Sequence, residues 1–501
     1  MHKARVGLIR VRLIWVKLIW VRLIWVRLIW VRLIWVGLMG LTLGLAMAAH
    51  AQEVVTKQYD DGSVYEGTFK NGRQDGTGTY TLPNGYIYTG AWVDGQIKGM
   101  GTARYPNGSV YEGNFDKGKP VGTGKITFPD GGTYQGDWAA GAMTGAGVAT
   151  YANSAVYTGA FKDGKQQGRG SMIEPGGTKY DGNWVAGVKE GKGRITYSDG
   201  TVYDGDLKGG KRDGTGTLIM PDGLTYLGDW AGGQINGTGK LTQPNGDIYE
   251  GSFTDGQRDG AGRVTYANGD FYLGDFKADK RQGKGAFSAK DGTRYEGGWV
   301  AGAMQGTGVM TYPDGSVYDG AFNADQPDGQ GKITYADKST YDGAWVAGVI
   351  TGKGTATYAS GQVFAGDFVA AKPEGQGMMT YPDGYTYKGS WKAGQREGYG
   401  IATYKDGSTY TGQFTAGMRD GKGSLSAPDG FTYIGDWKAG VIEGTGTATY
   451  PGGDIYEGSF KNGKREGTGK LTYKAGQSSE GLWQNGILRA PATAPPATPA
   501  P

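Results

Sequence analysis

The sequence predicts an all-β protein: an elongated, twisted antiparallel β-sheet rod of about 19 stacked β-hairpins. Three observations support this fold class. A 23-residue pattern restarts in unbroken register from Tyr65 to Ser479. Glycine, with 98 residues, recurs at fixed places in the pattern. Most copies place a Pro/Asn/Asp-Gly turn between two β-rich runs, which is typical of a hairpin.

Composition excludes several classes of function. Cysteine is absent, and both histidines, His2 and His50, lie in the N-terminal segment. A Ser-His-Asp or Cys-His site and a zinc site are therefore not expected in the array. The net charge of +4 comes from residues 1–51, which carry eight basic residues and no acidic ones. The remaining 44 basic and 48 acidic residues give a mildly acidic array, which argues against nucleic-acid binding.

The N-terminus divides into two segments. Residues 1–36 form a low-complexity leader of basic and apolar pentads. A five-residue step advances about 140° around a helix, so its cations do not form a stripe. Residues 37–51 have the apolar region and small residues of a signal peptide, with predicted cleavage after Ala51. We therefore expect export to the periplasm or cell envelope, with an uncleaved N-terminal anchor as the alternative.

The array is described by repeat positions, with Tyr65 as position 1. Residues 52–64 are expected to form an entry strand, 65–488 the repeats, and 489–501 a Pro/Ala-rich disordered tail. Glycine occupies positions 3, 12 and 14, a bulky residue occupies position 5, and positions 19–21 form a turn. The incoming strand leads into the Pro/Asn/Asp-Gly turn and the outgoing strand follows it. Because side chains alternate between the two faces of a strand, positions 1, 3 and 5 of the outgoing strand are expected to share one face, and positions 12, 14, 16 and 18 of the incoming strand are expected to share one face.

Two stretches, YEGTFKNGRQDGTGTY from Tyr65 and YEGSFKNGKREGTGKLTY from Tyr456, closely resemble MORN (membrane occupation and recognition nexus) repeats. The resemblance covers about residues 59–488. It implies a sheet of consecutive hairpins and suggests an association with membranes. Such repeats also accompany lipid-kinase domains, so a kinase name could be inherited by similarity, without activity. No catalytic domain is visible in this chain.

The recurring aromatics are interpreted mainly as structural, because the hairpins have few other apolar side chains with which to stack. A ligand platform for sugars, cations or acyl chains is the alternative. The residues singled out are Tyr65, Trp92, Trp138, Trp184, Trp230, Trp299, Trp345, Trp391 and Trp437.

Position 5 alternates Phe and Trp, with one slip where Phe253 is followed by Phe276. Copies with Phe more often continue with charged residues in positions 6–11. This alternation reflects either duplication of a 46-residue unit or a patterned ligand surface. The candidate ligand or partner residues on it are Lys70, Arg73, Lys119, Lys165, Lys211, Arg212, Lys461, Lys464 and Arg465.

Together these features predict a non-enzymatic scaffold of the cell envelope that binds a protein or surface partner through the loops and edges of the rod. The alternative is a membrane or phospholipid-headgroup binder, which the acidic balance weakens. No catalytic, cofactor-binding or metal-binding residue is identified, because each carboxylate recurs on an equivalent strand or turn. Oligomerisation through the rod ends is a further expectation.

Overall fold

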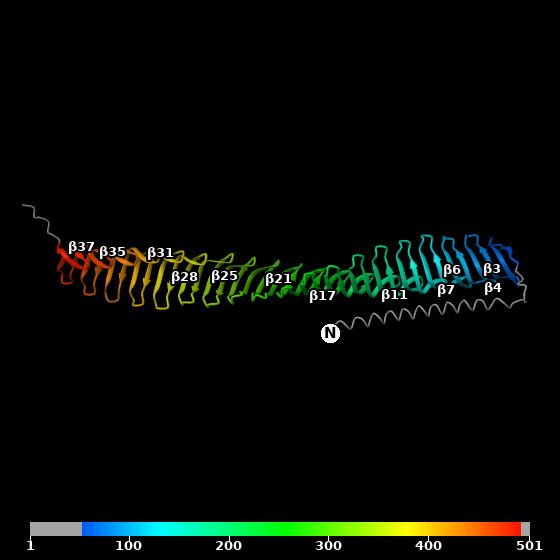
Figure 1. Cartoon of the computed structure of the whole chain (residues 1–501), viewed down its shortest axis with the longest axis horizontal. Helices are drawn as coiled ribbons and strands as arrows, with labels where there is room; N and C mark the ends of the chain where they lie inside the picture. The colour runs from blue at the N-terminus through cyan, green and yellow to red at the C-terminus, as the bar shows by residue number, and fades with distance from the viewer. Residues whose placement is uncertain (1–52, 492–501) are drawn as a thin grey trace, which may run out of the picture. The chain divides into compact units, whose positions relative to one another are not determined.

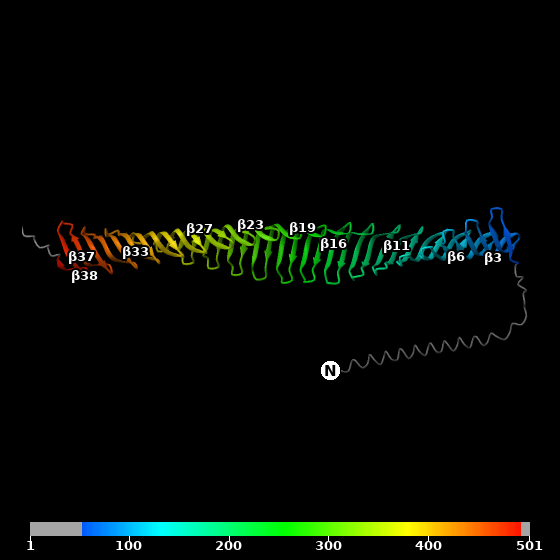
Figure 2. The same ribbon diagram turned by 90° about the horizontal axis from the view of Figure 1, so that it is seen from above.

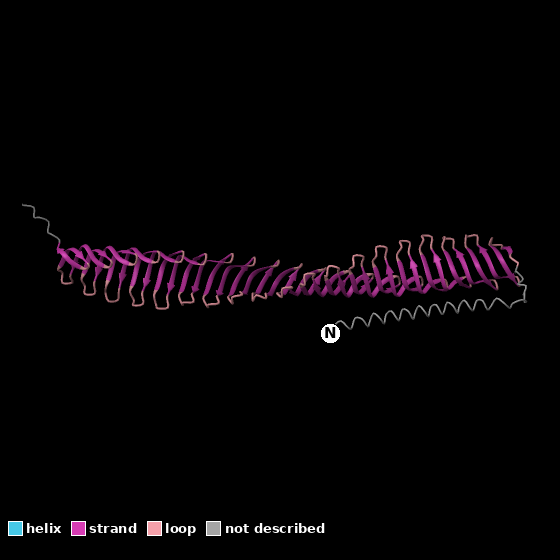
Figure 3. Ribbon diagram, viewed as in Figure 1, coloured by secondary structure: helices cyan, strands magenta, loops and turns pink. Residues whose placement is uncertain are grey.

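The structure is a computed structural model that describes residues 53–491. Within that range it contains 39 β-strands and no helix (Figure 3). The expected all-β fold of hairpin repeats is therefore confirmed. The described residues divide into two compact units, one that ends at Pro129 and one that begins at Asp130. The leader, the signal peptide, the cleavage after Ala51 and nearly all of the tail lie outside the described residues.

The first unit contains seven strands, each paired antiparallel with its neighbour in sequence. Their bounds are β1 (Val55–Gln58), β2 (Val64–Lys70), β3 (Arg73–Thr81), β4 (Ile87–Val93), β5 (Gln96–Arg104), β6 (Val110–Asp116) and β7 (Lys119–Thr127).

The second unit continues the pattern, and its hairpins follow one another in sequence order while the sheet twists (Figures 1 and 2). Its strands are β8 (Thr133–Ala139), β9 (Ala142–Thr150), β10 (Val156–Lys162), β11 (Lys165–Ile173), β12 (Lys179–Val185), β13 (Val188–Thr196), β14 (Val202–Lys208), β15 (Lys211–Ile219), β16 (Thr225–Ala231), β17 (Gln234–Thr242), β18 (Ile248–Thr254), β19 (Gln257–Thr265), β20 (Phe271–Lys277), β21 (Lys280–Ser288), β22 (Arg294–Val300), β23 (Ala303–Thr311), β24 (Val317–Asn323), β25 (Gln326–Thr334), β26 (Thr340–Val346), β27 (Val349–Thr357), β28 (Val363–Val369), β29 (Lys372–Thr380), β30 (Thr386–Lys392), β31 (Gln395–Thr403), β32 (Thr409–Thr415), β33 (Met418–Ser426), β34 (Thr432–Lys438), β35 (Val441–Thr449), β36 (Ile455–Lys461), β37 (Lys464–Thr472), β38 (Ser478–Gln484) and β39 (Ile487–Pro491).

The loop that joins the outgoing strand of one repeat to its incoming strand is shorter than positions 6–11, the segment in which the Phe and Trp copies differ. Between β10 and β11 it consists of Asp163 and Gly164 alone, with φ of 50° and 80°. Two consecutive positive φ angles are typical of a type I′ hairpin turn, which matches the twist of the flanking strands. Positions 6 and 9–11 therefore belong to strands rather than to a loop.

The expected single face for positions 12 to 18 is interrupted by a bulge. In the β10–β11 pair, Gly159 lies opposite Gly170 and Phe161 lies opposite Gln166. Between these two pairs, three residues of the incoming strand lie opposite a single residue of the outgoing strand. One of the three is Gly168, at position 12, which adopts a φ of 71°. Such a bulge bends the strand, because the extra residues interrupt the alternation of side chains between the two faces.

The second turn, at the Pro/Asn/Asp-Gly end, is held by the backbone and by one side chain. In the turn after β23, the N–H of Tyr312 donates to the oxygen of Ser316 at 2.8 Å. Asp314 accepts from the N–H and Oγ of Ser316, at 2.8 and 2.9 Å, which lowers the pKa of its carboxyl. The predicted turn is confirmed, and these two bonds tie its aspartate to the turn itself.

Candidate partner-binding surface

One face of the sheet is closed by its own rings. Tyr226 packs edge-on against Trp230 of its own repeat and Phe253 of the next, each with a centroid distance of 5.4 Å. Tyr226 is completely buried and Trp230 is 4% exposed. The same contacts recur through both units, so each repeat closes the aromatic layer of its neighbour.

The polar atoms of these rings are also occupied. Tyr226 Oη donates to the backbone oxygen of Asp229 at 3.0 Å, and Trp230 Nε1 donates to the oxygen of Gly216 at 3.3 Å. Burial raises the pKa of Tyr226 to about 12. The nine aromatics singled out from the sequence are all buried, which leaves little of their ring surface for a ligand.

A second layer, which the sequence analysis missed, lies over position 5. The side chain at position 10 reaches the position 5 ring of the following repeat. Arg281 lies 4.0 Å from the centroid of Trp299, and its Nη2 donates to the oxygen of Gly302 at 2.8 Å. A partly buried guanidinium on an indole face is a favourable cation–π pair. The available signal was position 10 of the preceding repeat, eighteen residues before each tryptophan of the array, which is always Arg, Gln or Pro.

Only some of the candidate basic residues belong to this second layer. Arg212 and Arg465 are position 10 residues, and each lies on the tryptophan of the next repeat, at 4.1 and 4.2 Å. Arg73 forms an exposed ion pair with Asp94 at 2.7 Å. The remaining candidates are exposed side chains that flank the two-residue turns: Lys70, Lys119, Lys165, Lys211, Lys461 and Lys464.

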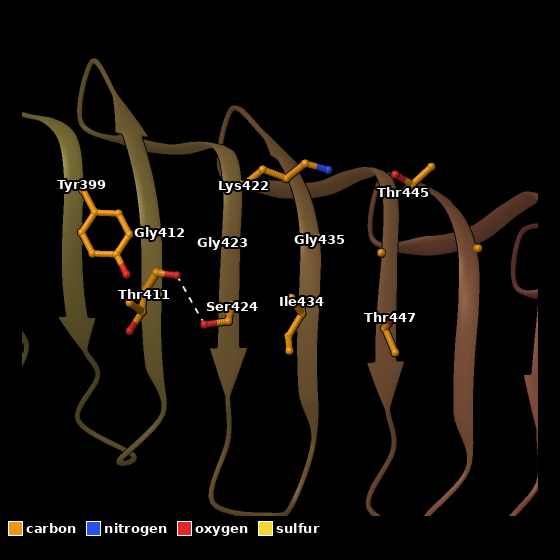
Figure 4. A pocket seen from close by; sticks show the side chains of 12 residues that line it. Tyr399, Thr411, Gly412, Lys422, Gly423, Ser424, Ile434, Gly435, Thr445 and Thr447 are labelled. Carbon is orange, nitrogen blue, oxygen red and sulfur yellow. Dashed lines mark hydrogen bonds between the residues drawn. The ribbon is translucent and has the colours of Figure 1, made fainter.

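The opposite face, here called the open face, is floored by glycine. Position 3 and 14 glycines pair across strands, as Gly412 does with Gly423 and Gly435 with Gly446. On one side a ring covers each such pair within a hairpin, Phe364 in one copy and tyrosine in the others, whereas on the other side no side chain rises from the glycines themselves. A hollow of about 590 Å³ results in the C-terminal part of the second unit (Figure 4).

Apolar side chains gather around this hollow. Tyr399 and Ile434 line it and are 61% and 65% exposed. Ile401, on the same strand face as Tyr399, is 42% exposed. The open face also carries ion pairs, such as Lys240 with Glu250 at 3.1 Å, and further exposed apolar side chains, such as Leu273 at 56%. Tyr399, Ile401 and Ile434, here called the 399–434 patch, were not singled out from the sequence.

The described residues present no cluster of three or more acidic or histidine side chains suited to a metal. Nor does the range 53–491 include a helical segment with the length and hydropathy that crossing a membrane requires.

The architecture is therefore that of a repeat scaffold, in which each hairpin is stabilised by the next. The profile of the MORN repeat matches eighteen consecutive segments between residues 65 and 478. The chain belongs to the MORN repeat family. A nineteenth hairpin, β38–β39, follows the matched segments in the structure.

No curated protein matches the chain. Among solved structures, the TCP domain of Drosophila melanogaster SAS-4 with a proline-rich motif of Ana2 is similar at 18% identity, 35% coverage of this chain, 88% of that chain and a TM-score of 0.21. The TCP10 domain of Danio rerio CPAP with a STIL peptide has 16% identity, coverages of 53% and 93%, and a TM-score of 0.17. Similarity at this level carries no inference about function.

Proposed function

We propose that this MORN repeat protein is a non-enzymatic scaffold of the cell envelope that binds a protein partner through the 399–434 patch of its open face. The observation that carries the proposal is the contrast between the two faces. The aromatic face is closed by its own side chains, whereas Tyr399 and Ile434 expose more than half of their surface beside a hollow. Exposed apolar groups with a polar surround are typical of protein interaction sites.

The surroundings of the patch favour a protein over a lipid headgroup. Thr411, Ser424 and Thr447 line the same hollow and can accept or donate hydrogen bonds. Lys422 is held by Asp436, so its charge is locally balanced. An anionic headgroup requires clustered, uncompensated cations. The location in the envelope rests on the predicted signal peptide.

A site-specific photo-crosslinker tests this binding. Placed at Ile434 in producing cells, it is expected to give a saturable protein adduct that Tyr399→Ala abolishes. Leu227 is the matched control, since it occupies the same repeat position and is 57% exposed, but lies outside the patch. An equal adduct from Leu227, or none that saturates from Ile434, would contradict the proposal.

Liposome co-sedimentation of residues 52–501 at two salt concentrations tests the lipid alternative. The exposed lysines beside the turns are the basis of that alternative. Pelleting with anionic vesicles only, and only at low salt, would favour membrane binding. Under the present proposal the chain stays in the supernatant with every vesicle composition.

A further inference from the structure

Near the Pro/Asn/Asp-Gly turns, the aromatic face carries a further set of rings, at positions 18 and 22. These two positions flank each turn, and the N–H of Tyr381 donates to the oxygen of Tyr385 at 2.8 Å. The ring of Tyr385 lies between those of Tyr381 and Tyr404, at centroid distances of 5.1 and 5.2 Å. The three rings form a row that ends at Tyr404, because position 18 of the following copy is Ala427.

Arg396 holds the middle ring of this row in place. Its Nη1 donates to Tyr385 Oη, and the arginine is partly buried. Its guanidinium carbon lies 5.5 Å from the ring centroid of Phe414 and 5.8 Å from that of Tyr385. The hydroxyl of Tyr385 is therefore occupied by the protein itself, and the ring is a fixed part of the surface.

A hollow of about 780 Å³ opens beside the row of rings, and its volume is in the range of small-molecule sites. Among the described residues, Tyr404 packs against no ring other than Tyr385, so a bound group can contact the rest of its ring. Two successive turns and one strand supply the other side chains. The hollow is lined by Asp383, Tyr385, Arg396, Tyr404, Lys405 and Asp406.

Several charged atoms at the hollow are free to bind a ligand. Asp383 Oδ1 accepts from the N–H of Tyr385 at 3.0 Å, but within residues 53–491 no donor bonds to its Oδ2. Over the same range Lys405 forms no ion pair. Asp406 accepts from the N–H of Ser408 at 2.9 Å, which lowers the pKa of its carboxyl. Two carboxylates, one ammonium and one guanidinium give the hollow no net charge.

We propose that this hollow binds a pyranose ring of a neutral oligosaccharide. A pyranose carries C–H groups on its faces and hydroxyl groups around its edge. The C–H groups would pack on the Tyr404 ring, whose face is the negative part of its quadrupole. A hydroxyl both donates and accepts, so the sugar would donate to Asp383 and Asp406 and accept from Lys405. The site lies on the face opposite the 399–434 patch and does not depend on it.

The mixture of ring surface and balanced charge selects this ligand over others. An anion would be repelled by Asp383 and Asp406, and a cation would be repelled by Lys405 and Arg396. A flat aromatic ring with few polar atoms would take water from these side chains without replacing its hydrogen bonds, which costs free energy. A neutral ring surrounded by hydroxyls replaces those hydrogen bonds.

The array contains a matched ring pair without the charges. Tyr86 and Tyr105 occupy the same repeat positions as Tyr385 and Tyr404, and their ring centroids are 5.6 Å apart. The ring pair alone is therefore a recurring element, and the charged groups distinguish the hollow. The residues that correspond to Asp383, Arg396, Lys405 and Asp406 are Asn84, Ile97, Pro106 and Asn107.

Saturation-transfer NMR with the full-length chain tests the site. The probes are cellohexaose, maltohexaose and hexa-N-acetylchitohexaose, which are neutral and differ in linkage and ring substituent. At least one is expected to bind saturably with a dissociation constant of about 1 mM or lower. Hexagalacturonic acid and the chitosan hexamer, which are charged relatives of opposite sign, should bind at least about tenfold more weakly.

Substitutions locate the binding on the chain. Tyr404→Ala should weaken it about tenfold or more, because the ring contact is lost, whereas Tyr404→Phe should retain it. Alanine is accepted at position 18, as Ala427 shows. Lys405→Pro introduces the commonest residue of position 19 and should weaken binding roughly two- to tenfold. Tyr105→Ala is the control and should leave binding unchanged.

The contradicting outcomes are equally specific. Failure of every neutral hexasaccharide to bind saturably to the wild type would refute the proposal. Equal losses from Tyr105→Ala and Tyr404→Ala, or equal binding of the charged oligosaccharides, would also refute it. Circular dichroism establishes that each variant keeps its strands. Tyr399→Ala, which alters the 399–434 patch, should leave saccharide binding unchanged, so this proposal and the protein-binding proposal are judged separately.

Discussion

The guanidinium carbon of Arg212 lies 4.1 Å from the ring centroid of Trp230, eighteen residues ahead in the next repeat. Its Nη2 also donates to the backbone oxygen of Gly233 at 2.8 Å. One side chain therefore joins two hairpins through a ring and a turn. This relationship gives the first prediction.

Replacing Arg212 with alanine should destabilise the boundary between its repeat and the next by about 1–3 kcal/mol, because a cation–π contact and a hydrogen bond are both lost. Amide hydrogen exchange of β15 and β16 measures the local free energy of opening. Lys211→Ala, at the exposed neighbouring position, should change it by less than about 0.5 kcal/mol. Equal effects of the two variants would contradict a structural role for Arg212.

The pairing of positions 10 and 5 is testable by a double-mutant cycle on Arg419 and Trp437, which lie 4.2 Å apart. Arg419→Ile leaves an Ile-before-Trp contact that no described repeat contains, whereas Trp437→Phe leaves an Arg-before-Phe contact like that of Arg396 and Phe414. The double variant recreates the Ile-before-Phe combination found at Ile442 and Phe460. We expect it to be more stable than the sum of the single effects by about 0.5–2 kcal/mol. Simple additivity would show that the alternation has no packing basis.

The strands approach closely at the glycine pairs, so we expect a single added methyl group there to lower the stability of the fold strongly. A Cβ on Gly159 would lie 2.6 Å from the Cα of Gly170 and 2.8 Å from Cζ of Tyr157. Gly159→Ala should cost about 3 kcal/mol, since backbone has to shift. Gly176→Ala is the matched control, because nothing lies within 4 Å of its Cβ position. Thermal unfolding of both variants decides the matter, and similar melting temperatures would be the unexpected result.

Alkaline pH should unfold the array cooperatively. Burial raises the pKa of Tyr226 to about 12 from the ordinary value of 10.0, and the same holds for Tyr180, Tyr249 and Tyr410. Above pH 10 the unfolded state loses phenolic protons that the folded state retains, so stability is full below pH 10 and declines between pH 10 and 12. The strand signal in circular dichroism should be lost together with the last part of the rise in phenolate absorbance, which belongs to the buried hydroxyls. A complete rise in phenolate absorbance with intact strands would contradict burial of these hydroxyls.

Much of the fold could be predicted from the sequence, because a strict period converts every local pattern into a repeated one. The aromatic layer at positions 1 and 5 and the Pro/Asn/Asp-Gly turn were both read correctly. The bulge was not, since Gly168 at position 12 looks like part of a simple alternation with Gly170, and only its positive φ reveals the extra residues. Phe364 shows that the ring at position 1, and not its hydroxyl, is required for the aromatic layer. Its ring contacts those of Phe368 and Trp391 at centroid distances of 5.0 and 5.2 Å, as tyrosine does in the other copies.

The candidate surface was harder to predict for two physical reasons. The contact of Arg281 with Trp299 joins one repeat to the next, so a comparison of positions within a repeat does not reveal it. The 399–434 patch depends on departures from the consensus at single residues. Tyr399 stands at a position usually filled by small or polar residues, and only the sheet register brings it to the same hollow as Ile434.

The layer of position 10 side chains also bears on how such a gene can change its length. Loss or gain of one 23-residue copy brings a position 10 residue suited to one ring before the other kind. Away from the slip at Phe253 and Phe276, removal of two adjacent copies keeps these pairings, so we expect length variants to differ by 46 residues more often than by 23. A guanidinium also fits a phenylalanine ring, since Arg258 lies 5.3 Å from the Phe276 ring at the slip and Arg396 lies 5.5 Å from the Phe414 ring.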